Sequence, residues 1–287
     1  MNPILWPDCR SVNWSDKSWF IASVVAYGVA TTYALLLWQR GFRRSDWVVY
    51  GLLAAGLVAH TIAMAKRGFS FHRCPVHNLY EATAFVMWSA VAGCLLLGLW
   101  SRLRTLCVFA APVVFAFGVF ALMPGMDPLR TPETPETNFT LRWISLHVAF
   151  IALAYGAFGL SFGSSMMYLS QVHDLKFNRL RALAALLPPV QQIERVIVRL
   201  QAAGIVLLSA GLLVSFIFLK TPDGQNLFVD PKVLWSILVW IAYTASSILY
   251  WRADHGGRNL AWGNCGCFVF VLLTFWGVNL LSKLHNP

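Results

Sequence analysis

The sequence predicts an all-α integral membrane protein with about eight transmembrane helices in one bundle. Of its 287 residues, 58% are hydrophobic and only 12% are charged, and the mean hydropathy is +0.62. Soluble domains carry about 25% charged residues, so this chain has too few charges for a water-facing surface. The charges also cluster, which leaves eight windows without Asp, Glu, Lys or Arg. Each window is close to the roughly 20 residues that a helix needs to cross a bilayer.

The windows place eight spans in a single polytopic membrane domain covering residues 1–287. The predicted spans lie near residues 18–39, 47–65, 79–101, 105–124, 143–170, 200–219, 231–251 and 260–282. The segment before the first span is mixed in charge, with Asp8, Arg10, Asp16 and Lys17, and no clear cleavage site follows. We therefore expect the first span to be retained as a helix and not removed as a signal peptide.

The connections between the spans predict the orientation of the chain. Residues 125–142 are acidic and rich in proline, whereas residues 40–44 and 176–199 are basic. Because basic loops stay on the cytoplasmic side, we expect both termini to be external. The net charge of +10 is spread over such loops and helix ends, so we expect a lipid bilayer and no nucleic acid as its partner. After Pro188-Pro189, apolar residues at helical spacing in 190–200 indicate an interfacial helix leading into the sixth span.

The six cysteines do not predict a disulfide framework, because most of them lie inside apolar windows. Cys265-Gly266-Cys267 favours close helix packing over a metal clamp, since no histidine stands nearby to complete a metal site. Cys9 and Cys74 would both be external and could pair in an oxidising compartment.

Histidines are the most informative polar residues, because a coordinating group within a membrane is costly and often functional. Of the seven, four fall in predicted loops and are expected to be solvated: His72, His77, His173 and His255. His60 lies inside the second span, where a hydrogen-bonded core histidine and a ligand remain alternatives.

His147 and His285 are expected to reach the same membrane face at similar depth. His147 stands four residues into the fifth span, and His285 follows the last span, which returns to that side. Two neutral imidazoles facing one site are suited to axial ligation of haem iron. Two ordinary interfacial histidines are the alternative.

Several segments, in order along the chain, resemble the cytochrome c assembly proteins of the CcsA/ResC type. The resemblance covers roughly residues 57–287. The segments are His60-Thr61, the stretch Arg73-Cys-Pro75-Val-His77-Asn78-Leu-Tyr80-Glu81, Trp143-Ile-Ser-Leu-His147-Val, the stretch from Leu187-Pro188 through Glu194-Arg195 to Gly204, and Gly277-Val278-Asn279-Leu280-Leu281 with His285.

This resemblance implies that haem b is bound transiently and without a covalent bond on the outer face of a bacterial cytoplasmic membrane. His147 and His285 stand at the positions of the iron ligands of the family. A tryptophan-rich loop that holds haem in the family corresponds to residues 223–232. Here it retains Gly224, Asp230, Pro231 and Lys232 and the following Trp235, but has Asp223, Leu227 and Val229 at tryptophan positions. Phe228 could supply part of a haem platform, but much of the aromatic surface is missing.

Two functions are therefore expected as alternatives. In the first, the chain delivers haem for attachment to apocytochrome c, together with a CcsB/ResB-like membrane partner subunit. Whether it is then a subunit of a haem lyase (synthetase) complex stays open. In the second, it is a HemX-like regulatory or scaffold protein of the haem pathway without attachment activity. The altered loop favours the second function, and the two histidines favour the first. The family's histidine late in the seventh span is replaced near Ile248.

Overall fold

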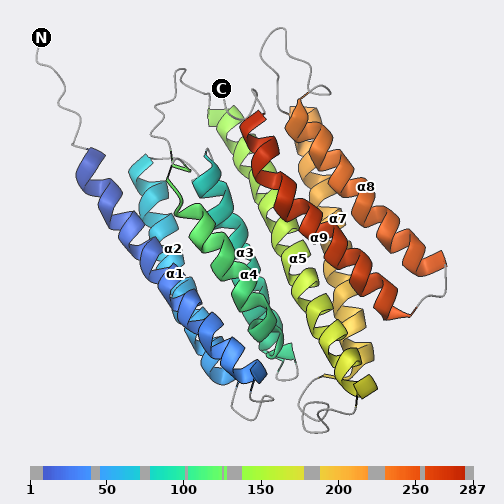
Figure 1. The fold of residues 1–287 in the computed structure, drawn as a ribbon. Coiled ribbons are helices and arrows are strands. Elements are labelled where there is room, and N and C mark those ends of the chain that lie inside the picture. Colours follow the sequence, from blue (N-terminus) through green and yellow to red (C-terminus); the bar gives the residue numbers. More distant parts are fainter. Residues whose placement is uncertain are drawn as a thin grey trace, which may run out of the picture.

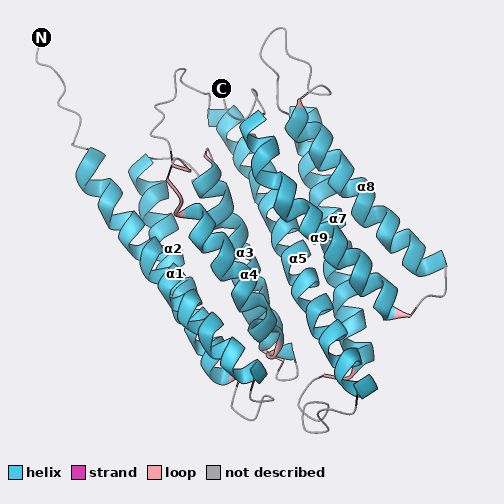
Figure 2. Cartoon of the chain, viewed as in Figure 1, coloured by secondary structure: helices cyan, strands magenta, loops and turns pink. Residues whose placement is uncertain are grey.

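The computed structural model describes residues 9–39, 46–71, 78–100, 103–124, 126–127, 138–177, 188–218, 230–252 and 256–281. Within these ranges every regular element is an α-helix (Figure 2), which confirms the predicted fold class. The helices are α1 Cys9–Gln39, α2 Trp47–Phe71, α3 Leu79–Gly98, α4 Leu106–Ala121, α5 Asn138–Phe177, α7 Val190–Phe218, α8 Pro231–Arg252 and α9 Gly257–Leu281.

Most of the helices have the length and composition of membrane spans. Six helical segments are both long enough and apolar enough to cross a membrane, namely Asp16–Gln39, Trp47–Ser70, Leu79–Gly98, Arg142–His173, Val190–Phe218 and Pro231–Arg252. Helix α4 is apolar but has only 16 residues, and α9 has 25. The chain is therefore a multi-pass membrane protein.

The helices form two neighbouring groups, α1 to α4 and α5 with α7 to α9 (Figure 1). The most extensive contacts join α1 to α2 and α5 to α7, while α3 and α4 pack on α5 and connect the two groups. Helix α1 begins, and α9 ends, at the same end of the bundle, shown at the top of Figure 1. Helices α5 and α8 also begin at this end, which we call the upper end.

Two clusters of tightly packed side chains form the core, and the first extends from α1 to α4 into α5, α7 and α9. The first includes Phe20, Tyr27, Leu53, Met87 and Leu106. The second includes Tyr155, Phe158, Trp235, Tyr243 and Phe268, and in it the rings of Phe158 and Tyr243 stack with centroids 3.8 Å apart. Lipid tails are as apolar as these side chains, so close packing and hydrogen bonds, and not transfer from water, hold the helices together.

Exposed tryptophans mark the opposite, lower end of the bundle. They are Trp38, Trp47, Trp100, Trp251 and Trp262, each at least 45% exposed and each near the lower end of its helix. The guanidinium of Arg104 lies over the ring of Trp47, 3.5 Å from its centroid. Tryptophan and arginine concentrate at membrane–water interfaces, so this belt agrees with the membrane assignment.

The helix boundaries differ from the sequence prediction where charged residues lie inside a helix. Helix α2 continues to Phe71, past Lys66 and Arg67, where the predicted span ended at residue 65. The predicted interfacial helix at 190–200 is the first part of the one continuous helix α7. A charge marks the end of an apolar window, but it does not end a helix when its side chain finds a partner or reaches the interface.

Candidate functional site

His147 lies near the upper end of α5, and α7 fixes its imidazole. Its Nδ1 atom is 2.8 Å from the carbonyl oxygen of Gly211. A carbonyl oxygen only accepts hydrogen bonds, so Nδ1 carries the proton and Nε2 keeps a free lone pair. Hydrogen bonds of this kind set the tautomer and ring orientation of metal-binding histidines. His147 therefore has the form that ligates iron.

Aromatic and basic side chains surround His147 at this end of the bundle. Trp143, one turn earlier on α5, stacks on Phe218 at the end of α7, with ring centroids 3.6 Å apart and an interplanar angle of 5°. Phe218 is 38% exposed. Lys232 is the second residue of α8, which begins at this same end of the bundle (Figure 1). The upper ends of α5, α7 and α8 thus combine an imidazole, flat apolar surface and a cation.

Asp230 and Pro231 start helix α8. The Oδ1 atom of Asp230 accepts hydrogen bonds from the backbone N–H groups of Lys232, at 2.9 Å, and Val233, at 3.3 Å. Proline suits the first helical position, because it has no N–H group to leave unpaired. The Asp230-Pro231-Lys232 sequence therefore forms the N-terminal cap of α8, and this structural role does not depend on a ligand.

Trp235 lies inside the bundle and not on the surface. It is 7% exposed, and its Nε1–H donates to Thr274 Oγ1 of α9 over 2.7 Å. Its ring stacks near that of Tyr155 on α5, with centroids 5.9 Å apart. Trp235 thus fixes α8 against α5 and α9, one turn below the predicted haem-binding loop.

His60 is fully buried in the first group of helices, on α2. Its Nδ1 is 3.3 Å from the hydroxyl oxygen of Tyr27, and its ring meets Phe20 edge-on at 5.1 Å. The Nδ1 contact fits a hydrogen-bonded core histidine, but the buried Nε2 atom has no hydrogen-bond partner among the described residues, so the ligand alternative stays a prediction. The structure does not bring His60 and His147 together, because α2 and α5 belong to different groups.

The remaining predicted site residues lie outside the described part of the chain. They are His285, Gly224 and Phe228, so their predicted roles remain predictions. The same holds for His72, His77, His255 and the pairing of Cys9 with Cys74. His173 is exposed, but the prediction that it lies in a loop is wrong, because α5 continues past it to Phe177. Cys94, Cys107, Cys265 and Cys267 are free thiols, which agrees with the expected lack of a disulfide framework among them.

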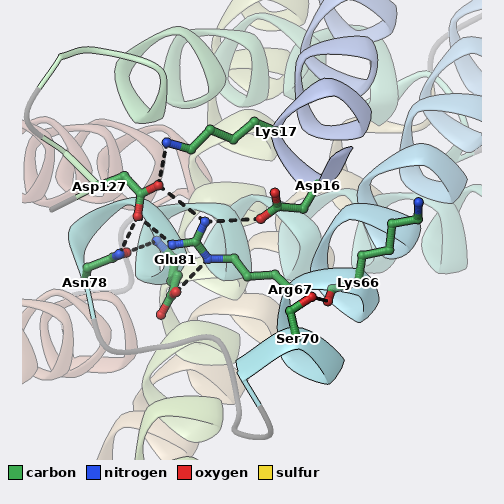
Figure 3. Close-up of polar contacts among 8 residues, drawn as sticks. All are labelled: Asp16, Lys17, Lys66, Arg67, Ser70, Asn78, Glu81 and Asp127. Carbon is green, nitrogen blue, oxygen red and sulfur yellow. Dashed lines mark hydrogen bonds and ion pairs between the residues drawn. The ribbon is translucent and has the colours of Figure 1, made fainter. Parts of the chain in front are cut away.

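Sequence reasoning missed a buried ionic network at the upper end of the first group (Figure 3). Arg67 on α2 pairs through Nε with Glu81 Oε1 at 2.6 Å, through Nη1 with Asp16 Oδ2 at 3.2 Å, and through Nη2 with Asp127 Oδ1 at 2.5 Å. Lys17 Nζ lies 2.8 Å from Asp127 Oδ2. Arg67 is only 5% exposed. A charge this deep is stable only when it is paired and hydrogen-bonded.

The network ties four separate segments together. Asn78 caps α3 by accepting from the backbone N–H of Glu81 at 2.7 Å, and it donates to Asp127 Oδ1 at 2.7 Å. The backbone N–H of Tyr80 donates to the carbonyl oxygen of Met126 at 3.1 Å. The connection after α4 is thereby anchored to α1, α2 and α3.

Burial and hydrogen bonding compete at the Asp127 carboxylate. Burial raises its pKa, but hydrogen bonds and charges from Arg67 and Lys17 outweigh this and hold the pKa below the ordinary value of 3.8. One sequence signal could have found the network. A glutamate two residues into a membrane helix needs a cation, and Arg67 is the nearest candidate at the same end of the preceding helix.

An apolar cavity of about 30 Å³ lies between the two groups of helices. Its walls come from α3, α4, α5 and α9 and include Thr83, Met87, Phe117, Tyr155 and Phe268. As it stands in the structure, the cavity has room for water-sized groups and not for a porphyrin. No group of three histidine, cysteine or acidic side chains in the described residues is placed to hold a metal ion without a porphyrin.

The fold and the site define a polytopic helical membrane protein with an imidazole, a stacked aromatic pair and a cation at one membrane face. The family described as "Cytochrome C assembly protein" matches residues 76–285, and the chain belongs to this family.

Curated relatives match over most of the chain. Protein HemX of Bacillus subtilis (strain 168) is 22% identical, over 92% of this chain and 95% of its own length. Protein HemX of Brevibacillus brevis is 28% identical, over 85% and 88%. Cytochrome c biogenesis protein CcsA of Prochlorococcus marinus (strain MIT 9215) is 25% identical, over 74% and 75%. The matches thus include both kinds of protein that the sequence suggested, and they support a membrane protein of the haem pathway.

Proposed function

We propose that this protein binds haem b at the upper end of α5, α7 and α8 and presents it to apocytochrome c. The observation that carries the proposal is the free Nε2 of His147, held by the Nδ1 hydrogen bond to Gly211. An imidazole with this tautomer is ready to ligate iron. Membership of the cytochrome c assembly family supplies the haem context.

The described residues fit a haem in three respects. His147 would be one axial ligand of the iron. The stacked pair Trp143 and Phe218 offers flat apolar area beside it. Lys232 would compensate the negative charge of a propionate. His285 is proposed as the second axial ligand on the strength of its position in the sequence.

When bound, the haem supplies the vinyl groups to which the thiols of apocytochrome c add. The chain's own part is to hold and orient, with His147 fixing the iron and the aromatic pair covering one edge of the site. A CcsB/ResB-like membrane subunit is the proposed partner in this work. The proposed location is the bacterial cytoplasmic membrane, with this site on the external face.

A HemX-like regulatory or scaffold role is the second candidate. It is favoured by the lack of tryptophan in residues 223–232, and by the two HemX proteins that match most of the chain. In this role the chain would act on the haem pathway without attaching haem to a cytochrome.

Attachment of haem to a reporter apocytochrome c separates the two candidates. The chain would be produced together with a CcsB/ResB-like subunit and the reporter, and haem staining after denaturing electrophoresis would detect the covalent product. The first candidate predicts stained reporter that depends on the chain and is lost in His147→Ala. Unstained reporter, with both subunits present in the membrane, would favour the HemX-like role.

A further inference from the structure

The second group of helices contains buried polar atoms that no described residue satisfies. Four of these atoms come from α7, α8 and α9, namely Gln201 Oε1, Tyr243 Oη, Thr244 Oγ1 and Asn264 Oδ1. Gln201 is 1% exposed, and Tyr243 and Asn264 are 0% exposed. We call these four residues the polar cluster. They are not part of the proposed haem site.

The orientation of the Asn264 amide is fixed by its neighbours on α5. Its Nδ2 group donates to Ser161 Oγ at 2.7 Å and to Ser165 Oγ at 2.8 Å. Both serine protons are already used, because Ser161 donates to the carbonyl oxygen of Ile197 and Ser165 donates to that of Ser161. The serines can only accept from Asn264. Its Oδ1 must therefore point away from them, toward an absent donor.

The Gln201 amide is fixed in the same way. Its Nε2 donates to the backbone carbonyl oxygen of Tyr243 at 3.0 Å and contacts Ser247 Oγ at 3.0 Å. Because a carbonyl oxygen cannot donate, exchanging the nitrogen and oxygen of this amide would lose the first bond. Oε1 of Gln201 is thus a second acceptor that lacks a donor among the described residues.

Three of the four residues, Gln201, Tyr243 and Asn264, are linked through shared neighbours. Ile197, which accepts the Ser161 proton, lies one turn before Gln201 on α7. Gln201 in turn bonds the carbonyl of Tyr243, and the Tyr243 ring stacks on Phe158, one turn from Ser161 on α5. The two amides and the phenol therefore share one level of the bundle.

We propose that the polar cluster binds ordered water within the membrane-spanning part of the bundle. An unpaired buried polar group costs about 1–3 kcal/mol, so four of them are costly without a partner. The cluster carries no formal charge, and its two amide oxygens require donors. Water meets these needs, since a buried water molecule makes two to four hydrogen bonds to such groups.

A polar stripe connects the cluster with the lower end of the bundle. Tyr243, Ser247 and Tyr250 follow one another at helical spacing on α8. The hydroxyl of Tyr250 donates to Glu194 Oε1, near the start of α7, over 2.8 Å.

X-ray radiolytic labelling of the full chain in lipid nanodiscs tests the proposal. Hydroxyl radicals form from bound water and oxidise side chains beside it, and mass spectrometry then locates the products. Cys265, which is next to Asn264, should be oxidised several-fold faster than Cys94 and Cys107. These two thiols lie buried in the first core and serve as internal controls.

Substitutions in the polar cluster test whether the oxidation of Tyr243 and Cys265 depends on the polar atoms of the cluster. Gln201→Leu and Asn264→Leu remove the two amide oxygens at similar volume and should slow oxidation of Tyr243 and Cys265 several-fold. Ser164→Ala is the matched control, because Ser164 already donates to the carbonyl of Leu160 in its own helix, and labelling should not change. Equal labelling of Cys265 and Cys94 in the wild-type chain would overturn the proposal. The proposal would also fail if a variant with both Gln201→Leu and Asn264→Leu were labelled like the wild-type chain. Both measurements use haem-free protein, so their result does not depend on the proposed function.

Discussion

Arg67 shows how a single residue can organise one end of a membrane protein. Its guanidinium meets three carboxylates that come from α1, α3 and the connection after α4. Replacing such a group by a hydrocarbon leaves the carboxylates buried without their cation, which is far more costly than the net gain from forming the network. Arg67 is thus expected to be essential for folding of the upper end, although it lies outside the proposed haem site.

We predict that Arg67→Met lowers the free energy of unfolding by about 3–5 kcal/mol, as expected when one partner of a buried ion pair is removed. The measurement is thermal unfolding of the purified protein in one detergent. Lys66→Met is the matched control, since Lys66 is the exposed neighbour on the same helix. Equal losses in the two variants would show that the network contributes little to stability.

The pH dependence of stability should report the Asp127 carboxylate. Its pKa in the folded state is below the ordinary value of 3.8, because Arg67 and Lys17 outweigh the effect of burial. A lowered pKa contributes stability that is fully present above the unfolded value and is lost as the pH falls through the folded value. The melting temperature should therefore drop as the pH falls below 3.8. Asp127→Asn should flatten this part of the curve, and an unchanged slope would contradict the assignment.

Sequence alone could place His147 at the membrane face, because its position relative to the charge-free window is visible in the chain. It could not show the hydrogen bond to Gly211, which depends on the rotation of α7 against α5. Arg67 was missed for a different reason. Its charge was taken as the end of a span, whereas its partners Asp16 and Asp127 are 51 and 60 residues away and meet it only in the folded bundle.

At the scale of elements, the charge-free windows predicted the helices well because lipid leaves a spanning backbone few alternatives. Their ends were predicted less well. The predicted interfacial segment is the first part of α7, and α2 continues through Arg67 to Phe71. The starts of α2, α3 and α8 agree with the predicted spans that begin at residues 47, 79 and 231.

The N-cap of α8 predicts how Asp230 contributes to the stability of the protein without haem. Asp230→Ala removes the side chain that accepts from Lys232 and Val233, and should lower stability by about 0.5–2 kcal/mol. Asp230→Asn retains a capping oxygen and should be close to wild type. Thermal unfolding of both haem-free variants is the measurement. Equal destabilisation by Ala and Asn would mean that the charge of Asp230, and not its cap, matters.

At the scale of the whole molecule, two helix groups place the site at one end of the bundle. The starts of α5 and α8 and the ends of α2 and α9 lie at the upper end (Figure 1), with His147 near the start of α5 and Arg67 near the end of α2. This arrangement agrees with a functional face on one side of the membrane. The side itself is a prediction from the loops.

We predict that the upper end is external, with both termini and residues 125–142 and 220–232 on that side. Single cysteines would replace Thr134 and Arg181, which lie outside the described residues, in a chain without reactive native thiols. An impermeant thiol reagent applied to intact cells should label the cysteine at 134 and not that at 181. Labelling at 181 alone would reverse the orientation of the protein.

The central claim is that His147 ligates haem iron, and the absorption spectrum of the purified protein tests it most directly. In mild detergent the wild-type chain should show a Soret band and low-spin features in the oxidised and reduced forms. His147→Ala and His285→Ala should each shift the spectrum toward high spin and lose haem more readily, because one axial position is vacated. Added imidazole should restore part of the haem by filling that position, and His173→Ala should change nothing. A wild-type spectrum and haem content in both alanine variants, or a wild-type chain that never binds haem, would contradict the account.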